Sequence, residues 1–103
     1  MPVAVILRGD KRVPQRWLAK ELSLRRLRLA RPHEVLGVIG YVAGGVPPVD
    51  LPNNVLVVVD EDILSKHSVI AGGGDESSLL RISPNDILKL NPSSKILRVP
   101  TET

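Results

Sequence analysis

The pattern of hydrophobic and polar residues predicts short strands and helices that alternate along the chain. Apolar runs at residues 2–7 and 55–59 are typical of buried strands, and the second run is five consecutive aliphatic residues. Arginine and leucine alternate within residues 25–30, which predicts a half-exposed strand with its arginines on one face. Three further short strands are predicted, over residues 67–71, 78–82 and 95–99.

Proline positions predict where the helices begin. Pro14 suits the first turn of a helix that continues over residues 15–22, and Pro32 opens a second helix. Ser83 is the predicted cap of a third helix over residues 84–90. The elements alternate without strict βαβ spacing. They predict an α/β (α+β) fold with a mixed β-sheet or partly open barrel and short flanking helices.

Length and composition restrict the class of protein. One hundred and three residues suit one domain, residues 1–103, and we expect residues 92–103 to form a flexible tail. The chain has no cysteine, which excludes disulfides, thiolate nucleophiles and cysteine-ligated metal sites. The longest uncharged run, residues 35–49, is interrupted by glycines and prolines and cannot cross a bilayer as a helix. These features predict a soluble cytoplasmic protein without a membrane partner.

Charge is distributed unevenly. Residues 1–31 hold nine Lys and Arg against two acidic residues, whereas residues 32–103 hold five basic and nine acidic residues. This asymmetry is consistent with a polyanionic partner that meets the basic half. A solvated, arginine-rich surface explains the same asymmetry equally well. Arginines on a strand and a helix suit contacts with phosphate, whereas base stacking lacks support because Trp17 is the only aromatic residue in the basic segment.

Two glycine-rich loops are the main candidates for chemistry. In Gly44–Pro48, glycines allow close backbone approach and prolines stiffen the second half of the loop, so amide groups can be presented to a ligand. Gly72–Gly74 could cradle an anion or an ester carbonyl, but it lacks the spacing and lysine of a nucleotide P-loop. From the residues alone, a structural crossover and a plain hairpin turn are the simpler interpretations of these two loops.

Other polar groups give weaker signals. Asp60, Glu61 and Asp62 follow the buried strand and could hold Mg²⁺, but a solvated cap for the next helical turn is the better interpretation. His33 and His67 have no partner at motif spacing, and no G-x-S-x-G nucleophile elbow occurs. The sequence therefore predicts neither a metal nor a cofactor.

Taken in chain order, several segments resemble the YbaK / prolyl-tRNA editing domain family. Residues 40–48, Gly-Tyr-Val-Ala-Gly-Gly-Val-Pro-Pro, look like that family's GY-x-x-GG-x-x-P loop. The turn at residues 9–13, the strand at 57–60 and the segments at 70–74 and 80–86 come in the family's order. The family's domain normally starts with further segments, including a Lys-Thr strand whose lysine its deacylase activity needs. No residue here matches that lysine, and Lys11 belongs to a later turn, so the chain looks like a member that lacks its N-terminal part.

The resemblance implies an aminoacyl-tRNA deacylase, acting on the ester of a mischarged tRNA, specifically tRNA(Pro), and associated with prolyl-tRNA synthetase. It assigns the reaction to the loop Gly44, Gly45, Val46, Pro47 and Pro48, whose amides would hold the aminoacyl group. It assigns substrate contacts to Tyr41, Gly72, Gly73, Gly74 and Ser78. Contacts with tRNA phosphates are expected from Lys11, Arg12, Arg25, Arg26 and Arg28.

Two alternatives belong to other classes. The first is a catalytically inactive module of the same fold that binds tRNA or a synthetase. The second is a small interaction domain that forms a homodimer through apolar sheet surface left exposed by the missing segments.

Overall fold

A three-stranded parallel sheet forms the centre of the computed structural model, which describes residues 2–9, 11–74, 77 and 79–100. The strand order is β1 (Val3–Ile6), β2 (Leu56–Asp60) and β5 (Lys95–Leu97). β2 is the central strand and is parallel to both neighbours. A central parallel strand is covered on both faces, which explains why its sequence is a continuous aliphatic run.

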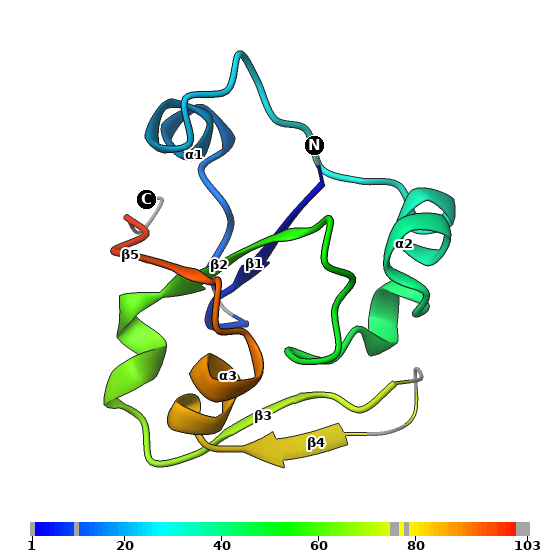
Figure 1. The fold of residues 1–103 in the computed structure, drawn as a ribbon, viewed down its shortest axis with the longest axis vertical. Helices are drawn as coiled ribbons and strands as arrows, with labels where there is room; N and C mark the ends of the chain where they lie inside the picture. Colours follow the sequence, from blue (N-terminus) through cyan, green and yellow to red (C-terminus); the bar gives the residue numbers. More distant parts are fainter. Residues whose placement is uncertain (1, 10, 75–76, 78, 101–103) are drawn as a thin grey trace.

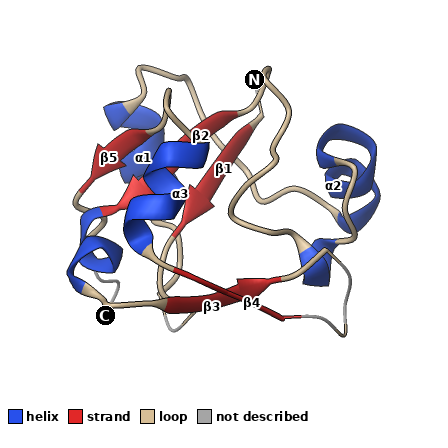
Figure 2. Cartoon of the chain, turned by 60° about the horizontal axis from the view of Figure 1, so that its bottom comes forward, coloured by secondary structure: helices blue, strands red, loops and turns tan. Residues whose placement is uncertain are grey.

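Helices α1 (Gln15–Glu21) and α3 (Pro84–Leu90) lie on opposite sides of this sheet (Figures 1 and 2). On one side, Val57 and Val59 of β2 pack with Ile87 of α3, and all three are buried. On α1, Leu18 is 1% exposed. α3 begins as the sequence predicts, because the Ser83 hydroxyl accepts a hydrogen bond from the Asp86 amide at 3.2 Å.

An antiparallel hairpin lies beside α3 (Figure 2) and is formed by β3 (Val69–Gly72) and β4 (Leu79–Ile82). The short helix η2 (Glu61–Ser65) connects β2 to β3. The expected α+β class is confirmed. The parallel and antiparallel pairings belong to two separate sheets, and no barrel closes among the strands that the structure describes.

Helix α2 (Pro32–Ile39) precedes the irregular stretch that holds the first glycine loop. Its C-cap is Gly40, with φ of 88°, a left-handed conformation that glycine adopts without a Cβ clash. The helix η1 (Ala43–Gly45) begins within three residues of this cap, so this part of the chain turns twice in a short distance.

The predicted strand over residues 25–30 is wrong. These residues have no strand pairing, and they run between α1 and α2 along one side of the molecule (Figure 1). Alternation alone does not make a strand, because the backbone also needs a neighbour with free hydrogen-bonding groups. Leu29 is 78% exposed, so the leucines of this segment do not form the buried face that the alternation suggested.

The C-terminal segment contains the last strand that the sequence predicts. The sequence predicts both a strand over residues 95–99 and a flexible tail over residues 92–103; residues 95–97 do pair with β2, and Val99 is 2% exposed. Residues 101–103 lie outside the described residues. Among the described residues, no helix is both long and apolar enough to cross a membrane.

Candidate active site at two glycine loops

The two glycine-rich loops predicted from the sequence meet in the structure. Gly72 ends β3 and lies directly against the backbone of the Gly44–Pro48 loop. A Cβ atom on Gly72 would lie 2.4 Å from the Val46 carbonyl oxygen and 2.9 Å from the Gly45 carbonyl carbon. Real Cβ atoms do not approach backbone that closely, so this contact requires glycine.

A backbone hydrogen bond connects the same loops. The Gly74 amide donates to the Gly45 carbonyl oxygen at 2.9 Å. Gly74 has φ of 109°, a conformation that residues with a side chain rarely adopt. Gly72 and Gly74 therefore hold the end of β3 and the residues directly after it against the first loop. Gly73 between them is exposed, and Ser78 lies outside the described residues.

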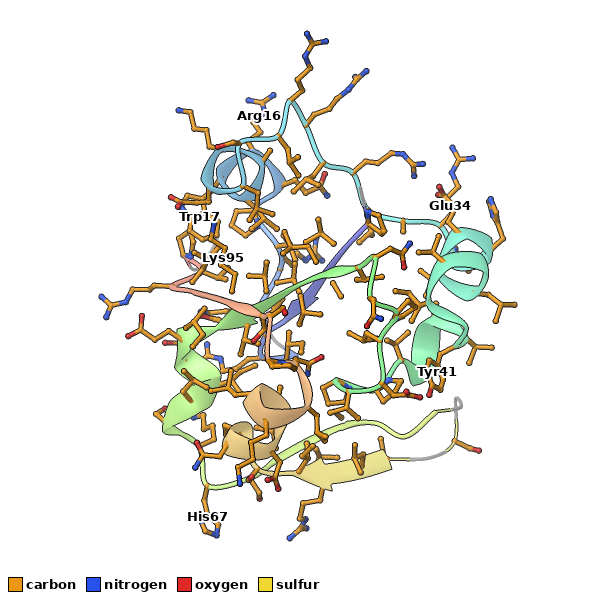
Figure 3. All side chains as sticks on the ribbon, in the orientation of Figure 1. Arg16, Trp17, Glu34, Tyr41, His67 and Lys95 are labelled. Atoms are coloured by element: carbon orange, nitrogen blue, oxygen red, sulfur yellow. The ribbon has the colours of Figure 1, made fainter. Side chains whose placement is uncertain are left out.

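Tyr41 lies before the first loop and is bonded to Asp50, which lies after it. Its phenol donates a hydrogen bond to Asp50 Oδ2 at 2.7 Å, and Figure 3 shows it beside the end of α2. The hydrogen bond to the Asp50 carboxylate raises the pKa of the Tyr41 phenol, since it favours the protonated form. The ring also approaches the second loop: a Cβ on Gly74 would lie 3.7 Å from Tyr41 Cε1.

A third anchor comes from α3. The Asn91 side-chain amide donates to the Pro48 carbonyl oxygen at 2.7 Å and to the Ile87 carbonyl oxygen at 2.8 Å. Asn91 is only 8% exposed, so both bonds are shielded from water. The far end of the first loop is thereby fixed to the helix that packs on the central strand.

Only part of the first loop can donate hydrogen bonds. Pro47 and Pro48 are buried and have no N–H, so they shape the loop but cannot stabilise an oxyanion. The Gly45 amide already donates to the Val42 carbonyl oxygen at 2.9 Å. Among the described residues, no hydrogen bond uses the amides of Gly44 or Val46. These two amides are therefore the donors that the loop has available.

Lys11 lies in a partly buried ion cluster. Its ammonium donates to Asp60 Oδ2 and Asp62 Oδ2, both at 2.7 Å, and to the Val99 carbonyl oxygen at 3.0 Å. The Lys11 and Asp60 side chains are 2% and 0% exposed. Hydrogen bonds to Asp60 and then Asp62 raise the pKa of Lys11, while the bond from Lys11 lowers the pKa of Asp62. The ammonium therefore faces two carboxylates and a backbone carbonyl.

The carboxylates after β2 also differ from the expected solvated cap. Asp60 does cap η2, since its Oδ1 accepts from the Asp62 amide at 3.3 Å. It is nevertheless fully buried, and its Oδ1 also accepts from the Val99 amide at 3.2 Å. The cation bound between Asp60 and Asp62 is the Lys11 ammonium. No cluster of metal-ligating side chains occurs among the described residues.

The remaining predicted cations divide into two groups. Arg28 is paired: its guanidinium donates to both carboxylate oxygens of Glu34, at 2.8 and 2.6 Å. Arg12, Arg25 and Arg26 are exposed. His33 and His67 are also exposed, and His67 lies at the far end of the molecule from α1 (Figure 3).

Comparison with known proteins identifies the family. The model of the aminoacyl-tRNA editing domain matches residues 1–90. The chain belongs to the aminoacyl-tRNA editing domain family. It is 30% identical over 84 residues to the proline–tRNA ligase of Aquifex aeolicus (strain VF5), covering 81% of this chain and 15% of the ligase. It is 30% identical over 90 residues to that of Lysinibacillus sphaericus (strain C3-41), covering 86% of this chain and 16% of the ligase.

Solved structures share the fold of this editing domain. A crystal structure of a hypothetical protein superimposes with a TM-score of 0.83 at 39% identity, covering 94% of this chain and 63% of the other. A candidate trans-editing enzyme for prolyl-tRNA synthetase superimposes with a TM-score of 0.80 at 28% identity, covering 96% of this chain and 61% of the other. The chain thus spans about a sixth of the ligases and less than two thirds of these structures.

Two parts of the editing domain give little signal in the sequence. Asn91 matches no motif. Its hydrogen bond to Pro48 forms only because the end of α3 lies close to Pro48 in the folded chain. The partnership of Lys11 with Asp60 joins residues 49 positions apart. The only sequence signal for this ion pair is the position of Asp60, directly after an aliphatic run typical of a buried strand. A carboxylate buried there requires a cation or hydrogen-bond donors nearby.

Proposed function

We propose that this chain is an aminoacyl-tRNA deacylase of the editing type, which hydrolyses the ester of mischarged tRNA(Pro) in association with a prolyl-tRNA synthetase. The observation that carries the proposal is the contact of Gly72 and Gly74 with the Gly45–Val46 backbone in a member of the editing-domain family. The similarity to two proline–tRNA ligases and to a candidate trans-editing enzyme supports the choice of substrate.

The proposed reaction uses backbone groups and water. Water attacks the ester carbonyl carbon, and the amides of Gly44 and Val46 donate to the oxygen that becomes negative. The bond between that carbon and the ribose oxygen then breaks, and a proton from the water passes to the ribose oxygen. The products are the free amino acid and uncharged tRNA. The loop acts through its fixed shape, so any change in its backbone should slow the reaction.

Selection among amino acids would come from a pocket whose size is set by residues of both loops. Val46 and Pro47 contribute side chains from the first loop, and Gly72–Gly74 contribute backbone from the second. A single methylene changes binding by only about 1–3 kcal/mol, which is why synthetases for small amino acids need an editing step. Small residues such as alanine or cysteine are the expected substrates.

The test is a deacylation time course on alanyl-tRNA(Pro) and cysteinyl-tRNA(Pro) with wild-type protein and two glycine variants. Gly72→Ala should abolish turnover, since its Cβ would collide with the Val46 carbonyl oxygen. Gly37→Ala is the matched control, because a Cβ at this exposed position of α2 meets nothing within 4 Å. Its turnover should equal that of wild type.

Two results would contradict the proposal. Folded wild-type protein without turnover on either substrate would leave an inactive module that binds tRNA or a synthetase. Equal turnover by Gly72→Ala and Gly37→Ala would mean that the contact between the loops does not form the reacting site. Circular dichroism of both variants shows whether each is folded before turnover is compared.

A further inference from the structure

A hollow of about 270 Å³ lies along α1, away from the two glycine loops. Four cationic side chains line it: Arg16 and Lys20 from α1, and Arg25 and Arg26 from the segment after the helix. All four residues are exposed, and none of the described residues that line the hollow is acidic. Figure 3 shows Arg16 on the side of α1 that is turned away from the parallel sheet.

A specific turn creates this hollow. The Ser23 amide donates to the Lys20 carbonyl oxygen at 3.1 Å, and the Leu24 amide donates to the Ala19 carbonyl oxygen at 2.8 Å. This pair of bonds is the Schellman motif, with Ser23 in the left-handed position at φ of 56°. The motif reverses the chain, so that Arg25 and Arg26 lie beside the helix that precedes them. The four charges are therefore gathered by defined backbone geometry.

Among the described residues, three cations outside the hollow are held in ion pairs. Lys11 is held by Asp60 and Asp62, Arg28 by Glu34, and Arg98 by Glu61. In the part of the chain that the structure describes, none of the four cations in the hollow forms a salt bridge. Four like charges close together repel one another, and an anionic ligand relieves that repulsion.

The lining also indicates what kind of anion binds. Guanidinium groups present paired N–H donors that match phosphate oxygens. The apolar lining residues are Ala19, Leu24 and Leu27, and none of the described lining residues carries an aromatic ring for base stacking. Recognition would thus be of the backbone and independent of sequence.

The hollow continues along the surface. Arg16 and Gln15 also line a second, neighbouring hollow, whose other lining residues include Arg12 and Trp17. Two neighbouring hollows that share Arg16 and are lined by further cations suit a polymer with regularly spaced negative charges better than a single free phosphate.

We propose that the hollow formed by Arg16, Lys20, Arg25 and Arg26 binds the phosphodiester backbone of RNA. That this RNA is tRNA rests on the proposed function. The location of the site rests only on the cations that line the hollow. Compared with the arginines and lysines predicted from the sequence, the proposed site includes Arg16 and Lys20 beside Arg25 and Arg26, and it does not include Lys11 and Arg28, whose charges are already paired.

The experiment measures binding of uncharged tRNA(Pro) by fluorescence anisotropy as a function of KCl concentration. The test variant is Arg16→Gln with Arg25→Gln. The control is Arg81→Gln with Lys89→Gln, which removes the same net charge from β4 and α3, on the opposite side of the molecule from α1 (Figure 1). Each lost phosphate contact should reduce the slope of log affinity against log salt by about 1, so the test variant should lose about 2.

We expect the test variant to bind at least tenfold more weakly than wild type at 100 mM KCl, while the control keeps the wild-type slope. Arg16→Lys with Arg25→Lys should keep most of the slope, since it preserves the charge. Equal losses in test and control variants, or no tRNA binding by wild type at low salt, would overturn the proposal. Equally tight binding to polyglutamate, lost in the same variant, would indicate an acidic protein surface as the ligand and would also overturn it.

Uncharged tRNA has no ester to hydrolyse, so its binding tests the basic hollow independently of the proposed deacylase activity. Binding that depends on the hollow, without any deacylation, would support the site and contradict the enzyme. Deacylation by a variant that has lost all four charges, at the wild-type KM and rate, would support the enzyme and contradict the site. Because the four side chains are exposed, their substitution should leave the urea unfolding midpoint unchanged.

Discussion

The Lys11 ammonium lies 2.7 Å from Asp60 Oδ2, and this pair joins three segments that are distant in sequence. Lys11 precedes α1, Asp60 ends the central strand β2, and the backbone of Val99, beyond β5, bonds to both side chains. A buried carboxylate without its cation is strongly unfavourable. The pair therefore holds the C-terminal segment to the core.

Lys11→Met should destabilise the protein strongly, because it leaves Asp60 buried without its cation. Adding Asp60→Asn should restore part of the lost stability, since the double variant buries no unpaired charge. Urea unfolding of the single and double variants measures this, with Lys66→Met as a control at an exposed lysine. A double variant less stable than Lys11→Met would contradict this explanation.

Stability should depend on pH through Glu34. The hydrogen bond from Arg28, followed by that from the Arg31 amide, lowers the pKa of Glu34 from 4.5 to about 2. A carboxyl with a lowered pKa in the folded state adds stability that is complete above pH 4.5 and is lost as the pH falls from 4.5 toward 2.

Glu34→Gln should therefore reduce the difference in urea midpoint between pH 6 and pH 2.5. Arg28→Gln should reduce it less, since the Arg31 amide still donates to Glu34 at 3.0 Å. A Glu34→Gln variant with the full wild-type pH dependence would show that other carboxyl groups account for the acid sensitivity.

Ser23→Gly should stabilise the protein by about 0.5–1 kcal/mol, since Ser23 occupies the left-handed region at φ of 56° and glycine adopts it without a Cβ clash. Ser93→Gly is the control, because Ser93 is exposed and does not have a positive φ. There glycine adds only flexibility to the unfolded chain and should destabilise slightly. Thermal unfolding of both variants checks the difference, and equal shifts would contradict the role given to the turn.

Elements that depend on local chemistry were predictable from the sequence. Ser83 with Pro84 fixes the start of α3, and Gly40 fixes the end of α2, because each cap is decided within one helical turn. The aliphatic run at 55–59 predicts the central strand, since strands covered on both faces are typically continuous hydrophobic runs. The irregular conformation at Gly44–Pro48 was also predictable, because glycine and proline restrict the backbone in recognisable ways.

Features that depend on distant contacts were not predictable. The alternation at residues 25–30 looked like a strand, but whether a strand forms depends on a free neighbouring edge that the sequence does not show. The ion pairs of Lys11 were not expected, because nothing near it in the chain reveals that Asp60 and Asp62 approach it. The contact between Gly72 and Val46 likewise arises only when β3 and the first loop are folded together.

Asn91 connects stability to the proposed reaction, because its buried amide holds Pro48 at the end of the loop. Asn91→Ala should cost about 1–3 kcal/mol, since it leaves the Pro48 carbonyl oxygen without this partner in a shielded position. The loop should then lose its fixed position, so deacylation should fall more than tenfold even under conditions in which the variant is folded. Asn85→Ala, at an exposed asparagine of the same helix, should stay within about 0.5 kcal/mol of wild type with unchanged turnover. Urea unfolding and the deacylation time course together decide the matter: an Asn91→Ala variant that is destabilised but turns over at the wild-type rate would show that α3 supports the fold without positioning the loop.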